Sequence, residues 1–91
     1  MKAEWKLFAD LAEVADDRHV TVETTGTTVG DALDALLADR PALEDRVLED
    51  GELRDHINVL RNGENIYTQN GLDTEVEDGD ELALFPPVSG G

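Results

Sequence analysis

The residues with the clearest chemical potential lie at the end of the chain, where Ser89 is followed by Gly90 and Gly91. Neither glycine has a Cβ atom, so this backbone can pass a narrow channel and adopt conformations closed to other residues. The preceding pair, Pro86-Pro87, is stiff and favours an extended course. Together these residues reach about 20 Å when fully extended. The pattern indicates an arm that presents its terminal carboxylate to another protein's active site; a plain Ser-Gly-Gly tail or an expression remnant is the alternative.

The composition excludes several classes of function. A chain of 91 residues with 40% hydrophobic residues allows one domain with a modest core. Cysteine is absent and His19 and His56 are the only histidines, which excludes disulfides, thiolate metal sites and a cysteine nucleophile in this chain. No nucleophile–base set or phosphate-binding glycine motif is present. We therefore expect a protein that is not an enzyme and that binds no metal or cofactor itself.

The charge of the chain is strongly acidic, with 22 acidic against 7 basic residues and a net charge of −15. Such a surface repels nucleic-acid phosphates and anionic lipids, so neither nucleic acid nor membrane is expected as a partner. It also repels a second copy, which favours a monomer. No apolar run approaches the roughly 20 residues of a membrane span and no signal-peptide pattern opens the chain, so the expected location is cytoplasmic.

Apolar patterns predict the elements that must carry the terminal arm. Five segments have the aromatic, β-branched or alternating character of strands: residues 4–9, 19–24, 56–61, 64–68 and 81–85. An apolar stripe after Thr28, with Asp31 as its capping-box partner, predicts a helix that ends before Pro41. Short helical turns are expected at residues 10–15 and 41–48, and Asn62-Gly63 predicts a tight hairpin. One helix on one face of a mixed sheet would bury these stripes.

Three segments together resemble the MoaD-type ubiquitin-like proteins. Residues 4–13 match their opening strand and turn, residues 28–33 their helix start, and residues 77–91 their closing strand and F-P-P-V-S-G-G tail. With the acidic composition, the chain is most similar to the small archaeal modifier proteins of the MoaD/ThiS-type sulfur-carrier superfamily. The resemblance implies an α+β, β-grasp (ubiquitin-like) fold, with a mixed sheet covered on one face by one main helix. It divides the chain into a domain at residues 1–86 and a flexible tail at residues 87–91.

The resemblance also implies a modifier and carrier on which other proteins act. In the family, an E1-like enzyme uses ATP to convert the terminal glycine into an acyl-adenylate. By that comparison Gly91 is the reacting residue, and Val88, Ser89 and Gly90 form the tail that activation requires. Activated Gly91 would then receive sulfur, giving a thiocarboxylate for molybdopterin synthesis or tRNA thiolation, or form an isopeptide bond with a target-protein lysine. ATP would be bound by the partner.

A partner-binding surface follows from the same resemblance. Phe8 and Phe85 match family positions that contact the E1-like enzyme or the MoaE-like large subunit of molybdopterin synthase, and Leu60 is a weaker third candidate. Independently of the resemblance, Phe85 shares a strand face with the small residue Ala83, so we expect at least one of the two phenylalanine rings to be partly exposed. Exposed aromatic side chains with a polar rim are typical binding anchors.

Two alternative functions remain open. The chain could be the dedicated small subunit of a molybdopterin synthase without protein conjugation, or a noncovalent acidic binding module whose tail is incidental. Lys2 and Lys6 are the only lysines and are possible conjugate acceptors. Their scarcity argues against chain building as the main role.

The acidic composition predicts that salt stabilises the protein. Raising the salt concentration from 0.1 M to 1 M shortens the Debye length from about 10 Å to about 3 Å, which screens the repulsion among the carboxylates. We expect the Tm to rise between low and molar salt, measured by circular dichroism during heating. A Tm that does not rise would contradict adaptation to a very salty cytosol.

Overall fold

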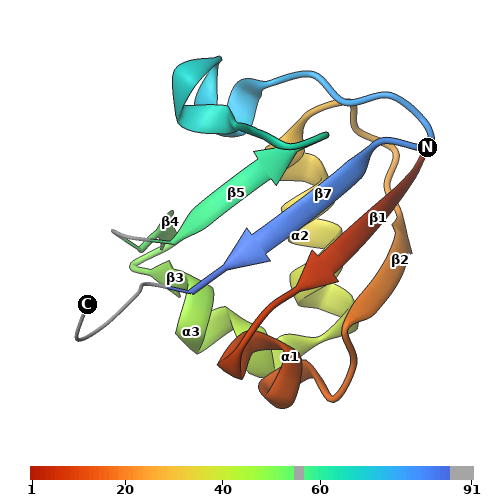
Figure 1. Ribbon diagram of the computed structural model, residues 1–91. Coiled ribbons are helices and arrows are strands. Elements are labelled where there is room, and N and C mark those ends of the chain that lie inside the picture. The colour runs from red at the N-terminus through yellow and green to blue at the C-terminus, as the bar shows by residue number, and fades with distance from the viewer. Residues whose placement is uncertain (55–56, 87–91) are drawn as a thin grey trace.

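The computed structural model describes residues 1–54 and 57–86. Within them, a five-stranded mixed sheet packs on one side against a main helix, α2 (Val29–Asp39), as Figure 1 shows. The middle strand, β7 (Glu81–Phe85), pairs in parallel with β1 (Lys2–Leu7), although the two lie at opposite ends of the described chain. The predicted α+β class, with one helix covering one face of a mixed sheet, is confirmed.

The remaining strands extend the central pair in the order β2-β1-β7-β5-β6. All three join it antiparallel: β2 (His19–Glu23) beside β1, β5 (Asn58–Arg61) beside β7, and β6 (Glu64–Asn65) beside β5. A separate ribbon consists of β3 (Leu48–Glu49) and β4 (Glu52–Leu53). The short helices are α1 (Asp10–Ala15), η1 (Pro41–Leu43), α3 (Glu44–Val47), η2 (Ile66–Thr68) and η3 (Gly71–Asp73). None of the described helices is long and apolar enough to cross a membrane.

The main helix begins and ends as the sequence predicts. The Thr28 hydroxyl accepts the Asp31 backbone N–H at 3.2 Å, and the Asp31 carboxylate accepts the Thr28 backbone N–H at 3.2 Å. This capping box satisfies N–H groups that a helix start leaves without partners. The hydrogen bonds, above all that from the Thr28 hydroxyl, lower the pKa of Asp31. The last helical residue is Asp39, so the helix stops before Pro41.

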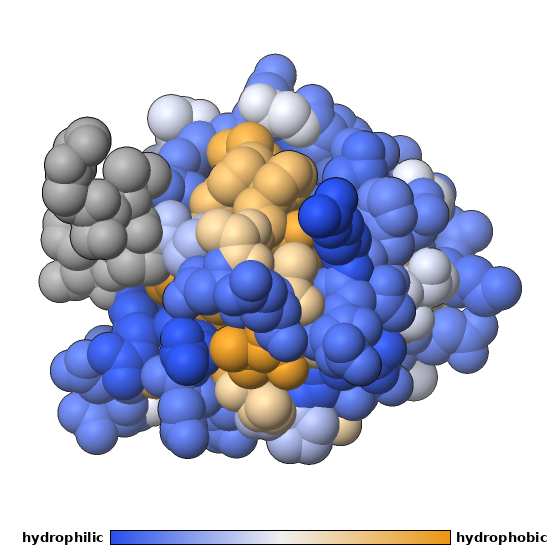
Figure 2. Space-filling model, turned by 60° about the horizontal axis from the view of Figure 1, so that its bottom comes forward, coloured by the Kyte–Doolittle hydropathy of each residue, from blue (hydrophilic) through white to orange (hydrophobic). Residues whose placement is uncertain are grey.

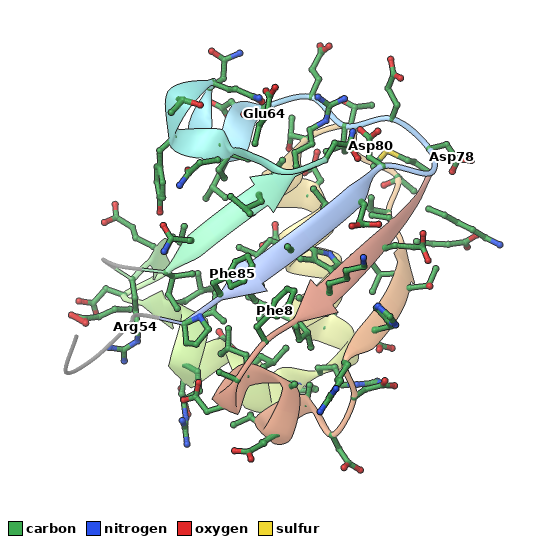
Figure 3. The ribbon with its side chains drawn as sticks, in the orientation of Figure 1. Phe8, Arg54, Glu64, Asp78, Asp80 and Phe85 are labelled. Carbon is green, nitrogen blue, oxygen red and sulfur yellow. The ribbon has the colours of Figure 1, made fainter. Side chains whose placement is uncertain are left out.

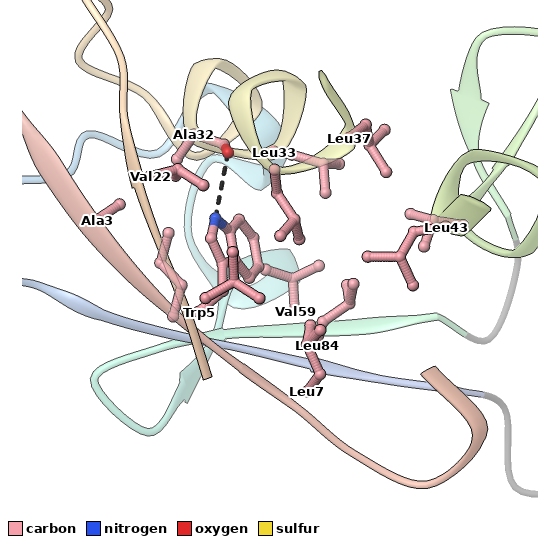
Figure 4. Packing of buried hydrophobic residues seen from close by; sticks show 14 of the residues in the cluster. Ala3, Trp5, Leu7, Val22, Ala32, Leu33, Leu37, Leu43, Val59 and Leu84 are labelled. Carbon is pink, nitrogen blue, oxygen red and sulfur yellow. Dashed lines mark hydrogen bonds between the residues drawn. The ribbon is translucent and has the colours of Figure 1, made fainter. Parts of the chain in front are cut away.

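The core lies between α2 and the sheet, with Trp5 at its centre (Figure 4). The Trp5 ring is fully buried, and its Nε1–H donates to the Ala32 carbonyl oxygen at 3.1 Å. This bond gives the polar edge of the indole a partner in the apolar interior and ties β1 to the helix. Leu33 and Leu36 of the helix and Leu82 and Leu84 of β7 are buried with it.

Three parts of the chain differ from the sequence-based expectation. The strand predicted at residues 64–68 is wrong beyond Asn65, because the Asn65 side-chain oxygen accepts the Tyr67 backbone N–H at 2.8 Å and turns the chain into η2. The ribbon of β3 and β4 was not predicted, although the turn at Asp50-Gly51 that joins them was expected. The first strand also begins at Lys2 and ends at Leu7, two residues earlier than predicted at each end.

A polar cluster joins the β5–β6 hairpin to the start of β7. The hairpin turns at Asn62-Gly63, where both residues have positive φ as predicted. Arg61 Nε donates to Asp80 Oδ2 at 2.8 Å, Asn62 Nδ2 donates to Asp80 Oδ1 at 3.1 Å, and the Glu77 backbone N–H donates to Asp80 Oδ2 at 2.8 Å. Burial of Asp80 opposes its ionisation, but these donors and the Arg61 charge outweigh burial, so the pKa of Asp80 is lowered.

The lowered pKa of Asp80 predicts a pH-dependent contribution to stability. A carboxyl whose pKa is lower in the folded state stabilises the fold at pH values above its unfolded pKa, here 3.8, and the contribution is lost as the pH falls through the folded value. We therefore expect Asp80→Asn to lower the free energy of unfolding at pH 7, and the difference from the parent to narrow below pH 3.8. Urea unfolding at fixed high salt, followed by Trp5 fluorescence, measures both.

The matched control is Asp34→Asn, which makes the same change of charge at an exposed position of α2. The free energy of unfolding of Asp34→Asn should differ little from that of the parent, and this difference should vary less with pH. A difference between Asp80→Asn and the parent that stays constant from pH 7 to pH 3 would contradict the role given to the Asp80 carboxylate.

Candidate functional site

The predicted contact residues Phe8 and Phe85 meet on the side of the sheet opposite α2. Their ring centroids are 4.2 Å apart and the ring planes are inclined by 10°, so the two rings are stacked. Figure 3 shows the pair in front of the sheet, near the ends of β1 and β7. Phe8 is 38% exposed and Phe85 is half-buried. The prediction that at least one of the two rings is partly exposed is confirmed.

The register of the two central strands brings these rings together. Lys6 pairs with Ala83 and Leu7 with Leu84, so the next position along each strand places Phe8 beside Phe85. Side chains alternate between the faces of a sheet, and Leu7 and Leu84 take the inward, buried positions. The phenylalanines therefore occupy outward positions, and their contact depends on the parallel pairing of β1 with β7.

The chain turns sharply directly after Phe8. Ala9 has φ 54° and ψ −133°, a region that residues with a Cβ atom rarely adopt and that costs about 1–3 kcal/mol. This turn starts α1 at once and buries Leu11 at 1% exposure while Phe8 stays on the surface. Leu7 before Phe8 and Leu11 after it are both buried, and together they fix the backbone that carries the exposed ring.

Two neighbouring rows of side chains cross the strands on the open face of the sheet near the stacked rings. One row runs from Lys6 on β1 through Ala83 on β7 and Leu60 on β5 to Asn65 on β6. The other runs from Phe8 through Phe85 to Asn58 on β5. Leu60, the weaker candidate from the sequence, is half-buried and belongs to the same surface as the stacked rings.

Between these rows lies a shallow, mostly apolar hollow of about 510 Å³, which we call the phenylalanine groove. Figure 2, in which the front of Figure 1 is tilted upward, shows hydrophobic surface gathered in one band with hydrophilic residues on both sides. An apolar hollow on an otherwise acidic surface is typical of a site that another protein covers. The groove is lined by Phe8, Ala9, Asn58, Leu60, Asn65, Phe85 and Pro86.

The groove adjoins the point where the predicted tail begins. Pro86, the last residue that the structure describes, lines the groove. Val88, Ser89, Gly90 and Gly91, which the sequence predicts as the activated tail, lie outside the described residues. The domain boundary predicted after residue 86 therefore stays a prediction.

The two lysines lie at different distances from the groove. Lys6 stands in the row of Ala83, and its Nζ is 2.9 Å from the Glu81 carboxylate. Lys2 is exposed at the other end of β1, and its backbone N–H donates to Asp78 Oδ1 at 2.6 Å. Both lysines that the sequence predicts as possible acceptors are thus accessible, but of the two only Lys6 lies beside the phenylalanine groove.

Sequence reasoning did not identify Ala9, Asn58 and Asn65 as residues of this surface. Asn65 could have been found, because the tight turn at Asn62-Gly63 places it opposite Leu60. Asn58 could not have been found, because its place beside Phe85 depends on the pairing of β5 with β7, which no local pattern encodes. The positive φ of Ala9 has no signal in the sequence, since glycine is the usual residue in such a conformation.

Comparison with known proteins agrees with the fold. The family model of the ThiS family matches residues 5–91. Small archaeal modifier protein 1 of Haloferax volcanii is 66% identical over 90 residues, which cover 97% of this chain and 99% of that protein. The crystal structure of SAMP1 from Haloferax volcanii covers 100% of both chains with a TM-score of 0.91 and 63% identity.

A second relative is named as a sulfur carrier. Sulfur carrier protein CysO of Mycobacterium tuberculosis is 30% identical over 74 residues, which cover 78% of this chain and 80% of that protein. The CysO chain matched in the crystal structure of the Amycolatopsis orientalis BexX/CysO complex has a TM-score of 0.82 at 29% identity and covers 98% of this chain and 99% of its own. This chain therefore belongs to the ThiS family of ubiquitin-like β-grasp proteins, a family of small modifiers and sulfur carriers rather than enzymes.

Proposed function

We propose that this chain is a protein modifier and sulfur carrier whose Gly91 is adenylated by an E1-like enzyme. The observation that carries the proposal is the stacked pair of Phe8 and Phe85, exposed beside Pro86, where the Gly-Gly arm begins. A partner bound at the phenylalanine groove would be within reach of the arm, which spans about 20 Å from Pro86 when extended. The domain thus supplies a docking surface and the arm supplies the reacting carboxylate.

The chemistry needs activation because a carboxylate is a poor electrophile. The carboxylate oxygen of Gly91 attacks the α-phosphorus of ATP, pyrophosphate leaves, and a glycyl adenylate forms. Hydrosulfide (HS⁻) or a neutral lysine amine then attacks the glycyl carbonyl carbon, AMP leaves with the bonding electrons, and the attacking sulfur or nitrogen loses a proton. The first nucleophile gives a thiocarboxylate and the second an isopeptide bond. Cysteine is absent from this chain, so any thiol that takes part belongs to a partner.

The groove suits a partner with an apolar anchor and a basic surround. Binding energy at protein interfaces concentrates in buried aromatic anchors, and the stacked rings offer such a contact without rearrangement of the fold. The net charge of −15 favours encounter with a positively charged partner surface. The related CysO of Amycolatopsis orientalis is known in a complex with BexX, which supports a protein partner for this fold. ATP would bind to the activating enzyme.

Removal of the terminal glycines tests the covalent chemistry. In Haloferax volcanii cells, we expect the full chain to appear both as a thiocarboxylate, seen in the intact mass as a sulfur-for-oxygen exchange, and as a branch on lysines of other proteins. Deletion of Gly90 and Gly91 should abolish both. No Lys or Arg follows Arg61, so trypsin would leave residues 62–91 as the branch; a protease that cleaves after Glu leaves only residues 82–91, whose sequence identifies the donor.

The outcomes separate the alternatives. A thiocarboxylate without branched peptides would favour a dedicated sulfur donor such as the small subunit of a molybdopterin synthase. Neither product would contradict the proposal and favour a noncovalent module.

Substitution of Phe8 tests the docking surface. We expect Phe8→Ala to reduce kcat/KM for adenylation at least about tenfold, which corresponds to about 1.4 kcal/mol, because the groove loses one of its two anchors. The matched control is Tyr67→Ala, which removes an aromatic ring that is 55% exposed and does not line the groove. Its kcat/KM should stay within about twofold of the parent. Equal losses in the two variants, with Trp5 fluorescence showing both folded, would contradict docking at the groove.

A further inference from the structure

Lys6 lies on the open face of the sheet, directly beside the phenylalanine groove. It pairs across the strands with Ala83, the residue that precedes Leu84 and Phe85 on β7. Its side chain is 39% exposed, and its Nζ is held 2.9 Å from the Glu81 carboxylate. Surface ion pairs contribute only about 0–1 kcal/mol, so this contact does not prevent the amine from leaving Glu81 to react.

Distances along β1 separate the two lysines. A strand rises about 3.3 Å per residue, which places the Lys6 Cα about 7 Å from that of Phe8 and the Lys2 Cα about 20 Å from it. A standard interface buries about 800 Å² on each partner, equivalent to a disc of about 16 Å radius. A footprint centred on the stacked rings therefore includes Lys6 and excludes Lys2.

Lys6 also lies next to a pair of acidic residues on the open face of the sheet. Glu4 on β1 lies directly opposite Glu81 on β7, an arrangement in which like charges repel. Lys6 follows Glu4 by two residues on the same face of β1, and its Nζ contacts the Glu81 carboxylate. Acylation of Lys6 removes this positive charge, so it makes the edge of the groove more acidic as well as more crowded.

We propose that Lys6 is an acylation site, and that attachment of the C-terminal glycine of a second copy to Lys6 closes the phenylalanine groove to the activating enzyme. Attachment of a second copy to Lys2 leaves the groove open. This inference rests on the proposed function, which supplies the glycyl adenylate. A copy acylated on Lys6 keeps its own tail but can no longer be activated, so conjugation at this position removes it from both sulfur transfer and further conjugation.

The acylation step balances without a further reactant. The Lys6 ammonium first loses a proton to solvent. The neutral amine attacks the glycyl carbonyl carbon of the second copy's adenylate, forming the C–N bond. The bond between that carbon and the phosphate oxygen breaks, AMP leaves with the electron pair, and the nitrogen releases its second proton. The product is an isopeptide bond between Gly91 of one copy and Nζ of Lys6 in the other.

The first arm of the test asks whether Lys6 is acylated. The chain is produced in Haloferax volcanii cells, purified, and cleaved after Glu, so that an acylated lysine carries a branch of residues 82–91. We expect this branch on Lys6 and its disappearance in Lys6→Arg. A branch that is found only on Lys2 or only on other proteins would overturn the assignment.

The second arm asks whether the attachment blocks activation. Cysteine is absent from the chain, so Lys6→Cys and Lys2→Cys each introduce a single thiol. Each variant is joined by a bismaleimide to a second copy that carries Gly91→Cys, which mimics the size and position of the natural conjugate. An E1-like enzyme that adenylates the unmodified chain is then assayed by ATP–pyrophosphate exchange with the linked and unlinked forms. The alkylated Gly91→Cys copy alone measures any background from the attached partner.

We expect linkage at position 6 to lower kcat/KM at least about tenfold relative to the unlinked Lys6→Cys variant, and linkage at position 2 to change it less than about twofold. An equal ratio of kcat/KM between the linked and unlinked forms at positions 6 and 2 would overturn the inference while leaving the proposed function intact. Failure of E1-like enzymes to adenylate the unmodified chain would instead overturn the proposed function, and this inference with it. Acetyl-lysine at position 6 removes the positive charge without adding a protein. A small effect of acetylation on kcat/KM would therefore assign the loss of activation to the attached protein.

Discussion

The parallel pairing of β1 with β7 is the constraint on which the rest of the structure depends. It joins the first and last described strands, places Trp5 against the helix, and leaves Leu84 on the buried face. The same register stacks Phe8 on Phe85 and places Pro86 at the phenylalanine groove. The core and the phenylalanine groove therefore lie on opposite faces of the same strand pair, and a change in its register would disrupt both.

The two faces of the sheet differ because, within residues 1–54 and 57–86, a helix covers only one of them. Helix α2 covers the inner face, and its capping box at Thr28 and Asp31 fixes where that cover begins. The outer face carries charged residues such as Glu4 and Glu81 next to the exposed aromatic pair. A net charge of −15 makes copies of the protein repel one another, which opposes association through the exposed apolar groove. Salt that weakens this repulsion between copies is also expected to stabilise the fold.

Local signals in the sequence were sufficient for much of the fold but not for the site. The helix after Thr28 and the hairpin at Asn62-Gly63 were predicted because their determinants lie within a few residues. The strand predicted as far as Thr68 was wrong because one hydrogen bond, donated by the Tyr67 backbone N–H to the Asn65 side chain, redirects the chain, and hydrophobic periodicity does not indicate such a bond. The contact between Phe8 and Phe85 depends on pairing across the whole domain, so a family resemblance could suggest both residues but no local pattern could stack them.

The place of β7 in the sheet has a consequence for how the protein is made. Its neighbours β1 and β5 are synthesised earlier but cannot join one sheet until β7 fills the gap between them. Bringing β1 and β7 together closes a loop of most of the chain, and only the contacts of β7 offset the entropy that this costs. A nascent chain that stops short of Phe85 therefore keeps the edge of β1 exposed. Prematurely terminated translation products would therefore lack a stable body and, under the proposed function, the reacting terminus as well.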